Sequence, residues 1–226
     1  KLAYIDQEQD AGNEVAMRHG IPMAGNFFQQ ELAIITGAVE AMVVDVQCIM
    51  PSLSQVAKCY HTKLITTSPK AKIPGAMHIQ FDEEKPTESA LQIVKEAIEN
   101  FKNRHSDVVI PEKQTKGFVG YSTEAIVGAL DKVTNSFAHP TGTVKPLVDA
   151  LKSGVLRGAV ALVGCNNHKV LHDRSHVELT KQLIKNDILV VTTGCGAYAC
   201  IKEGLMDKKA KDLCGVGLAT VCELVD

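Results

Sequence analysis

Short, uninterrupted apolar runs are the feature that most constrains the fold of this 226-residue chain. Strands with one wet face alternate apolar and polar residues, whereas strands buried on both faces of a parallel sheet read as continuous apolar runs. Turn signals bound these runs, which therefore predict parallel strands. Five segments have this pattern: Leu2–Ile5, Ala41–Val46, Gly117–Val119, Ala159–Val163 and Ile188–Val191.

Helical patterns separate the predicted strands. They cover Asn13–His19, Glu88–Lys102, Ser122–Asn135 and Val177–Lys185. Alternation of strand and helix predicts an α/β fold with Rossmann-like parallel sheets flanked by helices. A polar segment with Pro111 at residues 103–116 indicates a boundary. We therefore expect two consecutive units, 1–104 and 105–226, the first lacking its beginning and the second its end.

Composition narrows the class of protein. Apolar residues make up 45% of the chain and charged residues 22%, which is ordinary for a soluble globular protein. A net charge of −2 gives no reason to expect nucleic acid or an anionic membrane as a partner, and no apolar run is long enough for a membrane span. Seven cysteines without paired spacing favour a reducing, cytoplasmic setting. Because the chain begins with Lys1 rather than Met, we expect it to be part of a longer protein.

Three cysteines occupy equivalent positions relative to the predicted strands. Cys48, Cys165 and Cys195 each follow the carboxyl end of a predicted parallel strand, and glycine precedes the last two. Ligands gather at that edge of an α/β sheet, and helix N-termini there favour anionic thiolates. A cysteine after a strand is otherwise often a small buried hydrophobe. Because this placement recurs at three cysteines, we favour the alternative, in which their thiolates are ligands of an iron–sulfur-type cluster.

The remaining candidates are weaker. Four cysteines lie in helical or loop patterns, where a buried or structural role is the simpler interpretation: Cys59, Cys200, Cys214 and Cys222. His168, His172 and His176 recur every fourth residue, which predicts a helical stripe that either faces solvent or supplies ligands.

At this point four segments resemble the nickel–iron carbon monoxide dehydrogenase family, which is related to the hybrid cluster proteins. They are residues 18–34 (RHGIPMAGNFFQQELAI), 44–51 (VDVQCIMP), 162–167 (LVGCNN) and 193–197 (TGCGA). The resemblance implies oxidation of carbon monoxide with water to carbon dioxide, protons and two electrons. It implies that Cys48, Cys165 and Cys195 bind an iron–sulfur cluster, with or without nickel. A homodimer and a ferredoxin-like electron carrier are also implied, as is a chain that covers only the middle of the enzyme.

One departure from the family pattern opens an alternative. Asp10 stands where the family has a cysteine ligand, and Glu14 falls where the hybrid cluster proteins present a glutamate ligand. Carboxylates suit an oxygen-rich iron site better than a sulfide-rich nickel site. The sequence thus leaves open an iron–sulfur–oxo cluster that reduces hydroxylamine or another small nitrogen compound. A third hypothesis is a non-catalytic scaffold fragment, because family ligands are missing from this chain.

Overall fold

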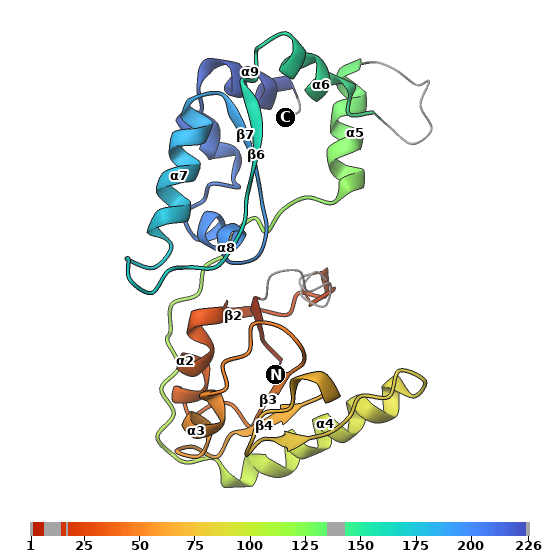
Figure 1. The fold of residues 1–226 in the computed structure, drawn as a ribbon, viewed down its shortest axis with the longest axis vertical. Helices are drawn as coiled ribbons and strands as arrows, with labels where there is room; N and C mark the ends of the chain where they lie inside the picture. The colour runs from red at the N-terminus through yellow and green to blue at the C-terminus, as the bar shows by residue number, and fades with distance from the viewer. Residues whose placement is uncertain (1, 7–14, 17, 135–142, 225–226) are drawn as a thin grey trace. The chain divides into compact units, whose positions relative to one another are not determined.

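The computed structural model describes residues 2–6, 15–16, 18–134 and 143–224. The chain divides into two compact units, Lys1–Gln114 and Thr115–Asp226 (Figure 1). Every strand pairing in the described residues is parallel, and helices alternate with the strands. The predicted α/β fold with parallel sheets flanked by helices is therefore confirmed. The boundary at residue 104 stays a prediction.

Unit 1 contains two small parallel sheets. In the first, β1 pairs with β2; in the second, the strand order is β3-β4-β5. The elements are β1 (Tyr4–Asp6), β2 (Met23–Asn26), η1 (Phe27–Gln29), α2 (Gln30–Ile35), β3 (Ala41–Val44), α3 (Leu53–Ala57), β4 (Lys63–Thr66), η2 (Pro69–Ala71), β5 (Met77–His78), α4 (Pro86–Asn100) and η3 (Phe101–Asn103).

The core of unit 1 joins α2 and α3 to the β3–β4 pair. Ile34 of α2 and Leu53 of α3 are fully buried, and they belong to one cluster with Val44 and Leu64 of the strands. Burying an aliphatic side chain of this size stabilises the fold by about 1.5–3 kcal/mol. This cluster therefore holds β3 in place and, with it, the start of the segment that leads to Cys48.

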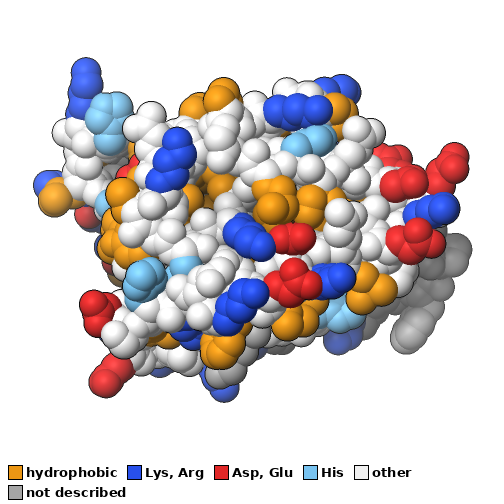
Figure 2. Space-filling view, turned by 90° about the horizontal axis from the view of Figure 1, so that it is seen from below, with side chains coloured by type: hydrophobic (Ala, Val, Ile, Leu, Met, Phe, Trp, Pro, Cys, Tyr) orange, Lys and Arg blue, Asp and Glu red, His pale blue; other side chains and the backbone are white. Residues whose placement is uncertain are grey.

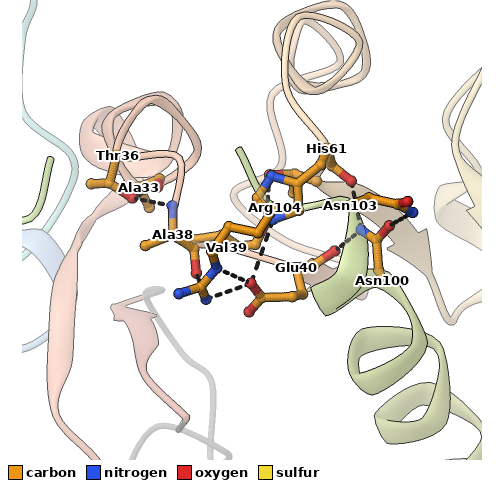
Figure 3. A network of polar contacts seen from close by, with 10 residues as sticks. Ala33, Thr36, Ala38, Val39, Glu40, His61, Asn100, Asn103 and Arg104 are labelled. Carbon is orange, nitrogen blue, oxygen red and sulfur yellow. Dashed lines mark hydrogen bonds and ion pairs between the residues drawn. The ribbon is translucent and has the colours of Figure 1, made fainter. Parts of the chain in front are cut away.

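A polar clamp ties the end of α4 and η3 to the start of β3 (Figure 3). Arg104 Nε donates to Glu40 Oε1 at 2.6 Å, and its guanidinium donates to the Ala38 carbonyl at 2.8 Å. Asn100 Nδ2 donates to the carbonyls of Glu40 and His61 at 2.8 and 2.5 Å. His61 Nε2 lies 3.4 Å from Glu40 Oε1. The half-buried Glu40 carboxylate therefore has more than one polar partner. These contacts contribute more to stability than an exposed ion pair does.

Helix α4 carries its apolar stripe on the exposed side. Leu91, Val94 and Ile98 of α4 and Phe101 at the start of η3 have the predicted helical spacing, yet they are 45–69% exposed. The side that contacts the sheet includes polar contacts, since Asn100 is buried and Lys63 of β4 pairs with Glu96 at 2.6 Å.

Figure 2 shows one face of the molecule, on which apolar, basic and acidic side chains are interspersed without a large patch of one charge.

Unit 2 is built on one pair of parallel strands, β6 (Gly158–Leu162) and β7 (Ile188–Thr192). Their register runs from Gly158↔Ile188 to Leu162↔Thr192. The other elements are α5 (Thr123–Thr134), α6 (Lys145–Lys152), α7 (Arg174–Lys185), α8 (Gly194–Lys202), η4 (Lys208–Leu213) and α9 (Val216–Leu224). Leu156, Ile184 and Leu218 form the buried core between these helices and the strands.

The prediction of a strand at Gly117–Val119 is wrong. Residues 115–122 contain neither strand nor helix, and Phe118 and Val119 are 48% and 45% exposed. A three-residue apolar run becomes a strand only where a neighbouring strand accepts its hydrogen bonds, and none is paired with it in the described residues. Among the helices of the described residues, none has the length and apolarity needed to cross a bilayer.

Candidate functional site

Cys165 and Cys195 leave the same edge of the β6–β7 sheet. Leu162 pairs with Thr192 at the carboxyl ends of the two strands, and each cysteine lies three residues beyond its member of that pair. The structure therefore places both cysteines at the carboxyl edge of parallel strands, as the sequence predicts. Figure 1 shows this edge with α8 packed beside it.

The two cysteines differ in their surroundings. Cys195 is fully buried in the first turn of α8, where backbone N–H groups favour a thiolate. Cys165 is exposed in a segment without regular structure between β6 and α7. Gly164 and Gly194, which precede them, have φ values of +117° and +57°. A side chain at φ +117° is strongly disfavoured, so glycine at 164 is required by the turn itself.

Gly196 lets the first turn of α8 lie against the ends of both strands. A Cβ at this position would lie 2.9 Å from Thr192 Oγ1, 3.2 Å from His176 Cδ2 and 3.2 Å from the Leu162 carbonyl oxygen. His176 Nδ1 and Thr192 Oγ1 are buried and have no hydrogen-bond partner among the described residues. Two buried side chains with an unpartnered polar atom, His176 and Thr192, therefore lie next to Gly196 in the turn that carries Cys195.

Sequence reasoning missed a second buried group in this region. Asn166 and Asp173 are 9% and 8% exposed and bond to each other twice. Asn166 Nδ2 donates to Asp173 Oδ1 at 2.9 Å, and the Asp173 N–H donates to Asn166 Oδ1 at 2.7 Å. Asp173 also forms an ion pair with Lys202 at the end of α8. The motif of residues 162–167 contains Asn166, but no periodicity in the sequence points to Asp173.

The histidine stripe predicted from the spacing is wrong. His168 and His172 lie in turns before α7, and only His176 is in the helix. Asn166 and Asp173 close the intervening segment on itself, which prevents a continuous helix from residue 168 to 176. His172 Nε2 instead lies 3.3 Å from Asp173 Oδ1.

Cys48 belongs to unit 1 and lies four residues after the end of β3. It is half-buried and has φ +51°, which is uncommon for a residue other than glycine. The buried Gln30 side chain at the start of α2 donates to the Cys48 carbonyl. Directly after β3, the Asp45 side chain accepts a hydrogen bond from Thr67 Oγ1 at 3.1 Å. The helix–sheet core thus holds the Cys48 backbone in an uncommon conformation.

Two other cysteines have environments that disfavour the thiolate. Burial raises the pKa of Cys200, and a hydrogen bond with Thr180 opposes that rise only in part. Burial also raises the pKa of Cys214 to about 11, with Cys222 and Asp187 adding to the rise. Neutral thiols are poor metal ligands, which agrees with the structural role expected for these cysteines.

The described residues do not form a complete metal site within one unit. In the described part of the chain, no three His, Cys, Asp or Glu side chains lie together in a way that would hold a metal ion. Asp10 and Glu14, the predicted oxygen ligands, lie outside the described residues. The donors that are described are cysteines, and soft thiolates suit iron–sulfur and nickel centres. In this respect the donor set fits the predicted cluster.

Comparison with known proteins identifies the family. The model of the Prismane/CO dehydrogenase family matches residues 10–224, which is nearly the whole chain. This chain belongs to that family. The resemblance noted in the sequence is therefore confirmed.

Members of the family match along most of this chain. Carbon monoxide dehydrogenase 1 of Methanosarcina acetivorans is 54% identical over 213 residues, covering 94% of this chain and 32% of its own length. The solved structure of carbon monoxide dehydrogenase IV from Carboxydothermus hydrogenoformans has a TM-score of 0.82 and 54% identity, over 97% of this chain and 34% of that one. A Ni-free structure of the enzyme from Thermococcus sp. AM4, produced without the CooC maturase, has a TM-score of 0.80 and 55% identity, over 95% and 32%. This chain thus spans about a third of the length of these relatives.

Proposed function

We propose that this chain is the central cluster-binding region of an anaerobic carbon monoxide dehydrogenase. The overall reaction is CO + H₂O → CO₂ + 2 H⁺ + 2 e⁻, which makes the protein an oxidoreductase. One observation carries the proposal: Cys165 and Cys195 leave paired strands at the same register position, in a family whose members are named for this activity.

The cofactor proposed is an iron–sulfur cluster, with or without nickel. When bound, it supplies a metal that binds the substrate and a store for two electrons. Cys48, Cys165 and Cys195 are assigned as thiolate ligands, and Glu14 and Asp10 as oxygen ligands.

The chain's own residues explain how such ligands are held. The first turn of α8 directs N–H groups toward the Cys195 region and so lowers the cost of negative charge there. Burial of Cys195 excludes water from one side of the site. Gly164 permits the turn that brings Cys165 out of β6. The unpartnered His176 Nδ1 and Thr192 Oγ1 are polar groups available behind Cys195 for a hydrogen bond or a water molecule.

The partners proposed follow from the family rather than from contacts of this chain. They are carbon monoxide as substrate, a ferredoxin-like electron carrier and a second copy of the full-length protein. A cytoplasmic location is proposed because seven cysteines without paired spacing fit a reducing compartment.

A hybrid-cluster-type hydroxylamine reductase is the second candidate. The observation that favours it is Asp10 at the position of a family cysteine ligand. A carboxylate there favours iron with oxygen ligands over nickel with sulfide. Metal content separates the two candidates, since only the first requires nickel.

The deciding experiment measures iron, nickel and sulfide in anaerobically purified protein. Because one relative was crystallised Ni-free after production without CooC, the protein should be produced with that maturase. The parent is compared with Cys165→Ala, with Cys59→Ala as the matched control because Cys59 is also exposed. Iron and sulfide in the parent and in Cys59→Ala, but not in Cys165→Ala, support the cluster. Nickel near one per chain then favours carbon monoxide oxidation, and iron alone favours the reductase.

A metal-free but folded parent would contradict both redox proposals. It would favour the third hypothesis, a scaffold that keeps the fold of the family without its chemistry. If the parent, Cys165→Ala and Cys59→Ala have equal iron and sulfide contents, Cys165 is not a ligand.

A further inference from the structure

A single buried carboxylate in unit 2 contacts both segments that carry a candidate ligand. Asp173 lies between β6 and α7, and it contacts the residue after Cys165 and the last residue of the helix that carries Cys195. We infer that Asp173 is a positioning residue, which fixes the Cys165 segment and α8 relative to one another. Its effect on a cluster rests on the function proposed above, whereas its effect on the two segments does not.

The contact with the Cys165 segment is made through Asn166. The two side chains form a closed pair, with Asn166 Nδ2 donating to Asp173 Oδ1 at 2.9 Å and the Asp173 N–H donating to Asn166 Oδ1 at 2.7 Å. Both residues are more than nine-tenths buried. Residues 163–173 contain no strand or helix, and this pair joins the two ends of the segment that carries the exposed Cys165.

The contact with α8 is made through Lys202. Its ammonium forms an ion pair with the other carboxylate oxygen, Asp173 Oδ2, and lies 4.6 Å from the centre of the Tyr198 ring. Tyr198 is one turn earlier on the same helix, so the ring and the carboxylate hold the lysine from two sides. Because each carboxylate oxygen serves a different segment, Asp173 couples the two.

The backbone of Asp173 fits this role and suggests a clean variant. Its φ of +66° lies in the left-handed region, which Asn and Asp tolerate better than other side chains. Asp173→Asn therefore keeps the backbone and an acceptor for Asn166, and removes the charge that attracts Lys202. Lys202→Met removes the cation of the same ion pair, whereas Lys202→Arg keeps a cation at this position.

A matched control is available in the same unit. Lys181 of α7 pairs with Glu203, the residue after α8, at 3.7 Å. Its side chain is 36% exposed, against 33% for Lys202, so Lys181→Met removes a similar lysine that also links α7 to the end of α8. Unlike Lys202, Lys181 has no described contact with Asp173.

The first measurement needs no cofactor. Metal-free protein is treated with iodoacetamide, and alkylation of the buried Cys195 is followed by mass spectrometry, with the exposed Cys59 of unit 1 as internal reference. We expect alkylation of Cys195 to be at least about tenfold faster in Asp173→Asn and Lys202→Met, because α8 opens more often. Lys181→Met and Lys202→Arg should match the parent. Equal rates in Lys202→Met and the parent would overturn the inference.

The second measurement reads the cluster itself. In anaerobically purified protein we expect Asp173→Asn and Lys202→Met to retain iron about tenfold less tightly and to change the electron paramagnetic resonance spectrum. Variants are compared at temperatures at which circular dichroism shows all of them folded. Faster alkylation with an unchanged spectrum would overturn the link to the cluster. A parent without iron would refute the proposed function, and the alkylation rates would then decide the role of Asp173 alone.

Discussion

Single glycines decide how closely α8 approaches the ends of β6 and β7. A Cβ at Gly196 would meet atoms of both strands and of α7, so a methyl group there has no room unless one of them moves. Gly128 in α5 is the opposite case, because nothing lies within 4 Å of a Cβ built on it. The two positions therefore separate a packing requirement from the general preference of a helix for alanine.

We expect Gly196→Ala to lower the free energy of unfolding by about 1–3 kcal/mol, since the new methyl group meets Thr192 Oγ1 at 2.9 Å. Gly128→Ala should leave it unchanged or raise it by up to about 1 kcal/mol, because alanine favours a helix interior. Urea unfolding followed by circular dichroism measures both. Equal effects of the two substitutions would contradict the packing argument.

The thiol of Cys214 should respond to alkaline pH. Its pKa is raised to about 11 by burial, with Cys222 and Asp187 adding to the rise, so it stays protonated when an exposed thiol ionises. A raised pKa in the folded state contributes stability below the pKa of the unfolded chain, about 8.5. That contribution is lost as the pH rises toward 11, because only the unfolded state binds fewer protons in this window.

We therefore expect stability to fall between about pH 8.5 and 11 in the parent, and to fall less in Cys214→Ala. The free energy of unfolding measured across this range decides the point. Cys59→Ala is the control, because Cys59 is exposed. A parent and a Cys214→Ala variant with the same alkaline slope would show that Cys214 is not responsible.

Among the elements, α4 shows how polar contacts contribute to the stability of unit 1. Its apolar stripe is exposed, and the Lys63–Glu96 pair contributes to its attachment. Asn100 and Arg104, which follows η3, add the contacts drawn in Figure 3. Hydrogen bonds to a charged group contribute more than neutral ones and leave a costly charge when one partner is removed. The clamp around Glu40 therefore matters more than the surface pairs of the same helix.

We expect Arg104→Met to lower the stability of unit 1 by about 2 kcal/mol, because Glu40 loses its closest cation. Lys95→Met removes an exposed pair with Glu99 at 3.8 Å and should cost less than about 0.5 kcal/mol. Thermal and urea unfolding by circular dichroism give both values. If the two variants behave alike, the clamp contributes no more than a surface ion pair.

Elements with a strong local pattern could be predicted from the sequence. The helix expected at Glu88–Lys102 corresponds to α4 and η3, and the runs at Ala159–Val163 and Ile188–Val191 correspond to β6 and β7. Strand β5 has only two residues and β4 begins with a lysine, so neither shows an apolar run. Both depend on pairing with a neighbour, which local periodicity does not reveal.

The candidate site divides in the same way. Placement of Cys165 and Cys195 at strand ends follows from the strands and could be predicted. The contacts of Asp173 could not, because its conformation is left-handed and its partners Asn166 and Lys202 are seven residues before and 29 after it in the sequence. Such contacts depend on where the chain returns in space rather than on a repeating pattern.

At the scale of the whole molecule, the chain behaves as two units joined by an exposed segment. Residues 107–122 contain no helix or strand, and residues 109–122 are exposed throughout. The units divide between Gln114 and Thr115, which lie between Lys113 and Lys116. Exposed segments without regular structure are the preferred sites of proteolysis, because a protease must bind its substrate in an extended form.

Limited trypsin digestion of the chain should therefore cleave first after Lys113 or Lys116, giving two fragments that correspond to units 1 and 2. Each fragment should then resist further digestion, since its lysines and arginines lie mostly on helices and turns packed on a core. Mass spectrometry identifies the first cuts, and Lys113→Gln with Lys116→Gln should slow their appearance at least about tenfold. First cuts inside α4 or α7 would instead mean that the units are not the cooperative parts of this chain. The proposed boundary between 104 and 105 would be supported only if the fragment that begins after Arg104 accumulated in place of these two.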